Sequence, residues 1–315
     1  MTSSPTSVRP DEVAGLASDG AGPDDPSGPR RAARRSGPVG MAGSRRAWML
    51  LAPSLVVVAL LLWWPLGTVV SISLQDFGIR ELRTGELAWV GLENYRNLLA
   101  DDLLWRYAFP NTVVFALVTV VLTLVLGTLV ALLLARLGSW ARGIVTTIIM
   151  VAWAMPAVTG TYVWRLAFDG DSGVLTGVLA SVGLFDPATD NLFTDRLWFF
   201  SIATLNVVHH GFPFVAITVL AGLMTLPKEV QEAAVMDGAN AWRRFWSITM
   251  PMLRPVFAVV TILSTIWNFK VFTQIYLMPA GDGSNREVLN LGTWSYSYAF
   301  GQGGYGPGAA IAVLL

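Results

Sequence analysis

The stretch Thr225–Pro255, TLPKEVQEAAVMDGANAWRRFWSITMPMLRP, lies between two long apolar runs and decides how the rest of the chain is interpreted. Its first part, Lys228–Met236, consists of strong helix formers. Asp237-Gly238 ends this helix, because glycine tolerates the left-handed conformation that commonly closes helices. Asn240 then suits the N-cap of a second short helix, Ala241–Ser247. The stretch therefore predicts a helix, a sharp turn and a second helix, held at a membrane surface.

The spacing of residues in this stretch resembles the EAA loop of membrane permease subunits of bacterial ABC importers. The extended form, with Phe245, Ile248 and the second proline Pro255, is similar to the carbohydrate-uptake, MalF-like branch of that family. The resemblance implies that the loop docks into a cleft on a separate ATPase. The positions that match the family's docking residues are Glu232, Ala233, Ala234, Asp237, Gly238, Ala239 and Pro251. An amphipathic helix lying on lipid is the alternative, but it explains neither the turn nor the trailing prolines.

The composition of the 315-residue chain is that of a membrane protein. Hydrophobic residues make up 54% and charged residues 13%, about half the charge of soluble domains. The absence of cysteine excludes disulfides and thiol catalysis. Lysine occurs only at Lys228 and Lys270, and neither follows the glycine series of a phosphate-binding loop. We therefore expect no cofactor in this chain, with ATP and Mg²⁺ bound by a partner ATPase.

The apolar runs predict an all-α integral membrane protein, a polytopic bundle of about six transmembrane helices with a cytoplasmic helix-turn-helix coupling loop. The sixth run is about half a bilayer long, so we expect the natural protein to continue beyond it. Pro156 loosens the third run, either as a packing kink or as part of a substrate path. The predicted spans are Trp48–Val70, Asn111–Leu134, Ile144–Leu166, Leu197–Met224, Val256–Leu277 and the incomplete Gly306–Leu315.

The N-terminal segment 1–47 is poor in large apolar residues and rich in arginine next to the first span. This composition predicts a disordered tail that stays in the cytoplasm, followed by a permease domain over 48–315. Arg243, Arg244 and Arg254 place the coupling loop on the same side. A nucleic-acid-binding tail is a less favoured alternative.

Polar side chains inside a span by default face a cavity or a protein interface. On a continuous fifth helix, Trp267, Lys270 and Gln274 fall within about 60° of one another, with Asn268 a little further round. An aromatic face beside hydrogen-bond donors suits a sugar. In the alternative interpretation, Lys270 extends to the outer surface and Trp267 meets a neighbouring helix.

His209 and His210 lie near the middle of the fourth span. Adjacent residues on a helix point about 100° apart, so both cannot share one face. The span contains no carboxylate or cysteine, which argues against a metal site. A hydrogen bond between helices, a place on the substrate path and a proton relay all remain open.

The resemblance implies the permease subunit of an ATP-driven importer in the bacterial cytoplasmic membrane, carrying a sugar or oligosaccharide. Residues 269–276 are similar to those of members that move cello- or chito-oligosaccharides. The implied partners are a second homologous permease subunit, a cytoplasmic ATPase dimer and an extracytoplasmic solute-binding protein. The main alternative, an ion-driven secondary transporter, predicts acidic residues at mid-membrane, and the predicted spans contain none. A membrane-embedded enzyme would need catalytic groups converging at one depth.

Overall fold

The computed structural model describes residues 41–86, 88–170, 172–186, 191–279 and 285–315. Contacts divide the chain into two units, residues 1–58 and residues 59–315. The first unit contributes α1 (Met41–Val58), which begins earlier than Trp48, the predicted start of the first span. Residues 1–40 of the predicted disordered tail lie outside the described residues.

The described part of the second unit is built from helices joined by short turns. Up to the fourth predicted span these are η2 (Ala59–Trp63), α2 (Trp64–Ser73), α3 (Ile79–Thr84), α4 (Glu93–Ala100), η3 (Leu104–Ala108), α5 (Phe109–Arg136), α6 (Ser139–Trp153), α7 (Ala157–Ala167), α8 (Val174–Ser181) and α9 (Arg196–Met224). The remaining elements are α10 (Lys228–Met236), α11 (Ala241–Arg244), η4 (Phe245–Thr249), α12 (Met250–Met252), α13 (Arg254–Phe269), α14 (Thr273–Leu277), η5 (Arg286–Val288), α15 (Leu291–Tyr296), η6 (Ser297–Gly301) and α16 (Tyr305–Leu314).

Four helical stretches in the described residues are long and apolar enough to cross a membrane. They are Trp48–Ser73, Leu104–Arg136, Arg196–Met224 and Arg254–Leu277. The pair α6 and α7 forms a fifth span if the two helices are taken together, and α16 is a shorter apolar helix. The predicted helical membrane bundle is therefore confirmed.

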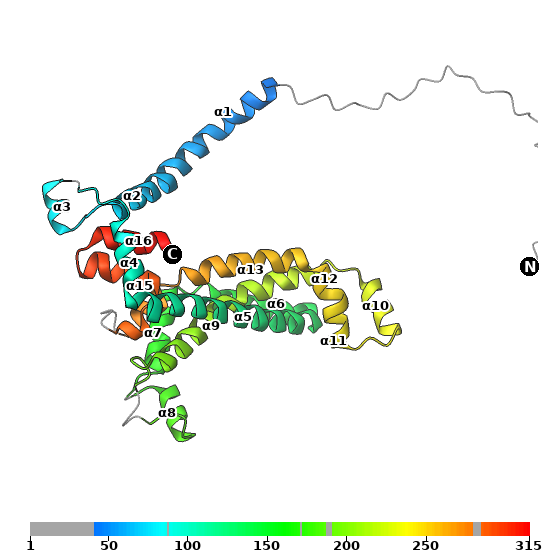
Figure 1. The fold of residues 1–315 in the computed structure, drawn as a ribbon. Coiled ribbons are helices and arrows are strands. Elements are labelled where there is room, and N and C mark those ends of the chain that lie inside the picture. Colours follow the sequence, from blue (N-terminus) through cyan, green and yellow to red (C-terminus); the bar gives the residue numbers. More distant parts are fainter. Residues whose placement is uncertain (1–40, 87, 171, 187–190, 280–284) are drawn as a thin grey trace, which may run out of the picture. The chain divides into compact units, whose positions relative to one another are not determined.

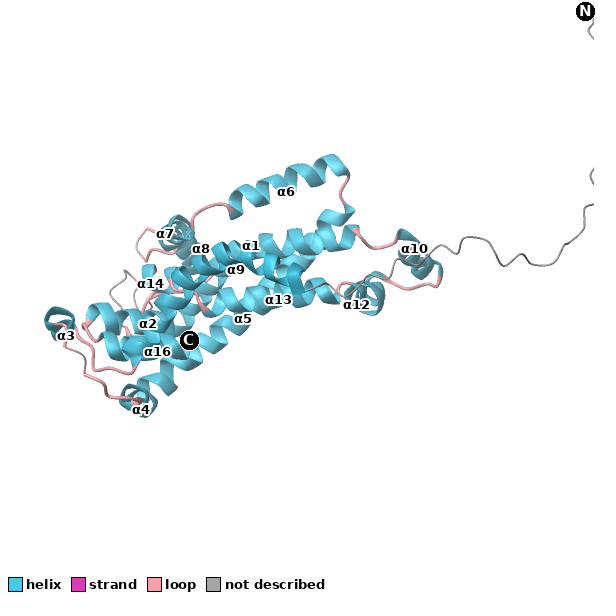
Figure 2. Cartoon of the chain, turned by 90° about the horizontal axis from the view of Figure 1, so that it is seen from above, coloured by secondary structure: helices cyan, strands magenta, loops and turns pink. Residues whose placement is uncertain are grey.

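The third predicted span is not one kinked helix but two helices at right angles. α6 ends at Trp153, α7 begins at Ala157, and the two are bent by 90°. Pro156 takes the N-cap position of α7, where its extended backbone (ψ 134°) cannot continue α6. Figure 2 shows α6 along its length while α7 is seen nearly end-on.

The fifth span is also interrupted, which corrects the continuous helix predicted over Val256–Leu277. α13 ends at Phe269, and α14 begins only at Thr273. The carbonyl of Val271 in the gap accepts a 2.8 Å hydrogen bond from Asn290 Nδ2 instead of a helical N–H. The angular arc predicted for a continuous helix is therefore wrong beyond Phe269.

α5 and α9 form the closest helix pair of the second unit, and α13 packs against both (Figure 1). Glycine permits this approach: a Cβ atom added at Gly127 of α5 would lie 2.6 Å from Val215 Cβ of α9. Further along the same pair, Gly211 faces Thr123, where an added Cβ would lie 3.2 Å from Thr123 Cγ2. The α5–α9 pair therefore forms the centre of the bundle.

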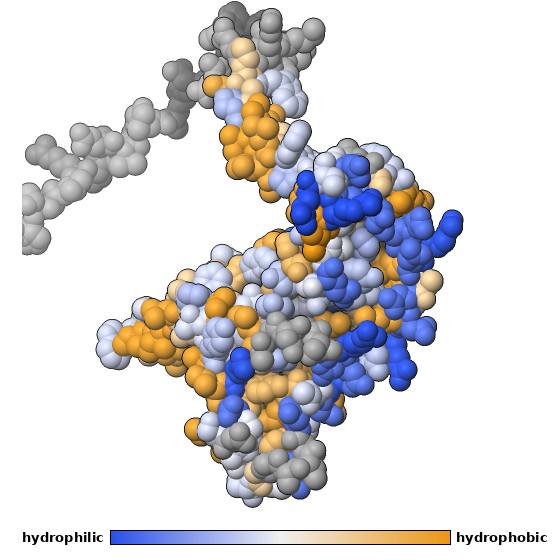
Figure 3. All heavy atoms as spheres, turned by 90° about the vertical axis from the view of Figure 1, so that its left-hand side faces the viewer, coloured by the Kyte–Doolittle hydropathy of each residue, from blue (hydrophilic) through white to orange (hydrophobic). Residues whose placement is uncertain are grey.

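The second unit has two ends that differ in construction. The segment Thr225–Pro255, which we call the elbow, carries α10 to α12 at one end, and α14, α15 and α16 lie at the other, the distal end (Figure 1). Figure 3 faces the distal end and shows hydrophilic side chains gathered along one side of it. At this end Asn111 donates hydrogen bonds to the carbonyls of Glu287 and Leu289 and accepts one from Arg196 Nε. This buried asparagine thereby fastens a distal loop to α5 and α9.

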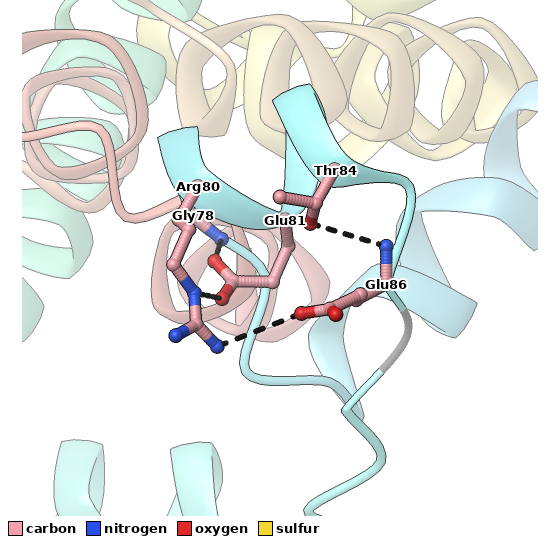
Figure 4. Close-up of polar contacts among 5 residues, drawn as sticks. All are labelled: Gly78, Arg80, Glu81, Thr84 and Glu86. Carbon is pink, nitrogen blue, oxygen red and sulfur yellow. Dashed lines mark hydrogen bonds and ion pairs between the residues drawn. The ribbon is translucent and has the colours of Figure 1, made fainter.

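The distal loop around α3 is held by one carboxylate. Glu81 Oε2 accepts the Gly78 N–H at 3.0 Å, and Glu81 Oε1 accepts Arg80 Nε at 2.9 Å (Figure 4). Arg80 also lies 3.9 Å from Glu86, which is exposed. Hydrogen bonding to its own backbone N–H, and then to Arg80, holds the pKa of Glu81 below its ordinary value. The ionised carboxylate is therefore the form that closes the first turn of α3.

We predict that Gly127→Val destabilises the purified protein, because the added methyl groups have no room against Val215. The cost of overpacking is about 1–3 kcal/mol. Thermal unfolding in detergent should show a lower Tm, whereas Gly143→Ala in α6, where a Cβ atom meets nothing within 4 Å, should leave Tm unchanged or higher. Equal Tm values for the two variants would contradict the close α5–α9 packing.

We also predict that the α3 turn loosens in acid. A carboxyl with a lowered folded pKa stabilises the fold above its unfolded pKa, and this stabilisation is lost as the pH falls through the folded pKa. Hydrogen exchange at the Gly78 amide, after correction for the intrinsic rate, should therefore show less protection below the ordinary carboxyl pKa. In Glu81→Gln the protection should no longer vary with pH in this range. A pH response equal to that of the wild type would contradict the role of the carboxylate.

Candidate functional site

The turn of the elbow forms as the sequence predicts. Gly238 has φ +75°, and the Ala239 N–H donates to the Ala234 carbonyl at 2.9 Å, which closes α10. Asn240 caps α11 through a 2.8 Å hydrogen bond from the Arg243 N–H. The second limb is longer than predicted, since α11 continues through the π-helical turn η4 into α12 and ends only before Leu253.

The two limbs of the elbow are tied together and expose apolar side chains. Gln231 Nε2 on the first limb donates to Thr249 Oγ1 on the second at 3.2 Å, and Thr249 is buried. Met236 is 87% exposed and Trp242 is 72% exposed, although neither lies within an apolar span. Exposed large apolar groups at one end of a molecule are typical of a surface that contacts another protein.

The elbow is anchored in the core of the bundle at its C-terminal side. Leu253 is buried against Val215, Val219 and Leu220 of α9, together with Ala131 and Leu134 of α5. At the same place, a Cβ atom added at Gly222 would lie 3.0 Å from Leu253 Cδ2. The C-terminal side of the elbow is therefore packed directly onto α9 and α5.

The predicted coupling residues cluster around the turn. Glu232, Ala233, Asp237 and Gly238 are exposed, Ala239 and Pro251 are half-buried, and Ala234 is buried. The exposed members present two carboxylates, a small side chain and the backbone of the glycine turn. Their role in docking remains a prediction.

A cavity of about 620 Å³ lies where the two interrupted spans meet. Its wall includes Ala154–Pro156 between α6 and α7, and Lys270–Phe272 between α13 and α14. Non-helical backbone at membrane depth is tolerated only where protein buries it or water reaches it. Two such breaks at one cavity therefore fit a space between the helices that water reaches.

Three of the aromatic side chains that line the cavity come from three different spans. Trp153 stacks with Phe214 at 6.4 Å between ring centroids, and Phe214 meets Trp267 edge to face at 4.9 Å. Trp267 is 49% exposed, so this ring contacts open space beside its aromatic neighbours. Aromatic faces of this kind suit the C–H face of a sugar ring.

Two buried polar atoms on the cavity wall have no hydrogen-bond partner. They are Asn268 Oδ1 and Thr123 Oγ1, in residues that are 8% and 2% exposed. Such groups cost free energy unless water or a ligand satisfies them. A water molecule or a ligand hydroxyl that reaches these two oxygen atoms would satisfy them.

The structure brings together most of the predicted substrate-path residues. Trp267, Asn268, Lys270 and Gln274 all line the cavity, although a broken span rather than one helical face places them there. The predictions did not include Thr123, Trp153 and Phe214, because threonine and aromatic residues in apolar runs carry no signal that separates cavity walls from packing.

The two histidine side chains of α9 lie in different surroundings, as expected for adjacent residues on a helix. His210 lines the cavity, whereas the His209 ring lies 5.9 Å from the Trp164 ring and 6.4 Å from that of Phe212. Neighbouring Asn206 donates a 3.3 Å hydrogen bond to Thr161 of α7. We interpret these contacts as placing His210 on the substrate path and His209 in the packing between helices.

A scan of family profiles matches residues 124–315 to the family described as "Binding-protein-dependent transport system inner membrane component". Similar curated proteins include the diacetylchitobiose uptake system permease protein DasB of Streptomyces coelicolor, 38% identical over 87% of this chain and 83% of that protein. The trehalose/maltose transport system permease protein MalF of Thermococcus litoralis is 33% identical over 86% and 88% of the two chains.

The fold resembles solved structures of the same kind of protein. A chain of a bacterial ABC transporter involved in the import of the acidic polysaccharide alginate superposes with a TM-score of 0.71 at 19% identity, over 87% of this chain and 92% of that chain. The chain belongs to the family of inner membrane components of binding-protein-dependent transport systems. It is a membrane-embedded permease subunit, as the elbow sequence predicted.

We predict that Lys270→Ala lowers solute uptake by the assembled transporter about two- to tenfold, the effect of losing one hydrogen bond to a ligand. Lys270→Gln, which keeps a donor, should lose less. Uptake by membrane vesicles, normalised to the amount of assembled complex, provides the measurement. Normal uptake by Lys270→Ala would reassign Lys270 to anchoring at the membrane surface.

Proposed function

We propose that this permease imports a sugar or oligosaccharide, and that a separate ATPase drives the import through the elbow. The observation that carries the proposal is the cavity: two unwound spans, an aromatic wall and unpaired hydrogen-bonding oxygens surround one space between the helices. A sugar needs an apolar surface for its ring face and hydrogen-bond partners for its hydroxyl groups, and these features match both needs. The relatives named for diacetylchitobiose, trehalose and maltose support the same substrate class.

The elbow end is the cytoplasmic end in this proposal, and the N-terminus lies on the same side. The arginines of the elbow and of the segment before the first span favour this orientation. The distal end then faces outward and receives the sugar from a solute-binding protein. A solved transporter of similar fold was captured with its alginate-loaded periplasmic protein, which supports this arrangement.

Coupling follows from the anchoring of the elbow. Glu232, Ala233 and Gly238 dock onto an ATPase dimer that holds ATP and Mg²⁺, and a second homologous permease subunit completes the path. When the ATPase closes, it moves the elbow, and Leu253 passes the motion to α5 and α9. The driving force is a difference in affinity, because the outward-facing state must bind the closed ATPase better than the inward-facing state does.

We predict that Glu232→Lys and Gly238→Pro abolish ATP-dependent uptake while the subunit still inserts. The first variant reverses an exposed charge on the docking surface, and the second removes the φ +75° that the turn requires. The measurements are sugar uptake and the amount of ATPase that co-purifies with the permease.

Glu86→Lys serves as the matched control, because Glu86 is an exposed carboxylate at the opposite end. The control should retain the ATPase in wild-type amount. If Glu232→Lys also retained the ATPase and transported normally, the elbow would not be the docking element.

A further inference from the structure

A file of six aromatic side chains runs from the cavity wall to the distal loop that precedes α3. Successive ring centroids lie 5.0–6.0 Å apart, and the members come from five separate segments. We call the set the aromatic file, and its members are Phe272, Tyr276, Tyr296, Phe300, Tyr305 and Phe77.

The file begins inside the proposed substrate site. Phe272 lines the cavity, and its ring stacks on Tyr276 at 5.0 Å with 16° between the planes. Tyr296 meets both rings edge to face, at 5.2 Å and 5.0 Å. The path then continues to Phe300 at 5.0 Å. The file therefore starts at the cavity wall and continues away from it through neighbouring rings.

The rings are not core packing, because none of the six is buried. Phe300 is 67% exposed and Tyr296 is 38% exposed, while the other four are half-buried. Because no ring of the file is fully enclosed, each keeps part of its surface open. Three of the six are tyrosines, and a phenol adds a hydroxyl that both donates and accepts hydrogen bonds. A surface that faced lipid tails alone would gain nothing from these hydroxyls.

The backbone holds the file in place at both ends. Asn290, which is 2% exposed, donates to the carbonyl of Val271 next to Phe272. At the far end the Gly306 N–H donates to the carbonyl of Phe77 at 2.8 Å, and a Cβ atom at Gly306 would collide with the carbonyl of Gln75. The rings are thus presented on a fixed frame, which keeps the entropy cost of binding low.

We propose that the aromatic file is a binding track for pyranose rings, on which a saccharide moves between the distal surface and the cavity. This inference rests on the proposed function. The exposed parts of the rings offer apolar surface to the C–H groups of the sugar units, and the hydroxyls of Tyr296 and Tyr305 bond the sugar hydroxyls. A series of similar weak contacts lets the sugar move along the track, because no single contact binds it tightly. Ion channels conduct for the same reason, through several weak binding sites.

Phe300 is the position to test, because it is the most exposed ring and lies between the two ends of the file. The full complex of permease pair, ATPase and solute-binding protein is reconstituted in lipid vesicles. The probes are radiolabelled trehalose and diacetylchitobiose, and the readout is sugar imported per ATP hydrolysed. Phe300→Leu keeps an apolar side chain of similar reach but removes the ring. Phe300→Tyr keeps the ring.

We expect Phe300→Leu to import about three- to tenfold less sugar per ATP, the loss of one aromatic stacking contact. Its ATP hydrolysis, stimulated by the loaded binding protein, should stay at the wild-type rate, and Phe300→Tyr should restore the ratio. The matched control is Phe109→Leu, since Phe109 is an exposed ring paired with Trp105 outside the file. This control should import as the wild type does.

Two results would overturn the track. An unchanged ratio in Phe300→Leu would show that the ring does not guide sugar. A parallel fall of import and ATP hydrolysis would assign the ring to contact with the second permease subunit or lipid. Failure of the wild-type complex to import either sugar would instead remove the proposed function, and with it the substrate of the track.

Discussion

The hydrogen bond from Asn290 Nδ2 to the Val271 carbonyl is the contact on which the architecture around the cavity depends. In a bilayer, an unsatisfied carbonyl costs several kcal/mol, so a span can be interrupted only where another group replaces the lost helical partner. Asn290 is buried and also caps α15 through the Thr293 N–H. One side chain therefore satisfies the backbone at the break in the fifth span and also caps the helix α15.

The two ends of the second unit serve different tasks, and the α5–α9 pair connects them. At the elbow end, Leu253 joins the hydrophobic cluster that holds these two helices together. Toward the distal end, Asn111 of α5 is bonded to Arg196 of α9 and to the loop before α15. Gly127 allows the two helices to pack without a gap. The elbow, the cavity wall and the distal loop are therefore connected through one closely packed helix pair.

Sequence reasoning located the elbow, the helical bundle and much of the cavity, for identifiable physical reasons. The turn at Gly238 and the cap at Asn240 depend on residues close in sequence, so they can be predicted without knowledge of the tertiary structure. Polar groups in apolar runs, such as Asn268 and Gln274, are costly enough to mark a cavity by themselves. The break at Lys270–Phe272 could not be predicted, because its replacement hydrogen bond comes from Asn290, on a different element. The aromatic file was missed for the same reason: its rings meet only once five segments are assembled.

The contact between Gly306 and the backbone of Gln75 and Phe77 has a consequence for biosynthesis. The partners lie far apart in the sequence, and residue 306 leaves the ribosome long after residue 77. The loop that follows the first span must therefore wait, without its backbone partner, until α16 is inserted. We expect this loop to be the part of a nascent permease that protective factors in the membrane shield longest, since late-closing contacts leave early segments exposed.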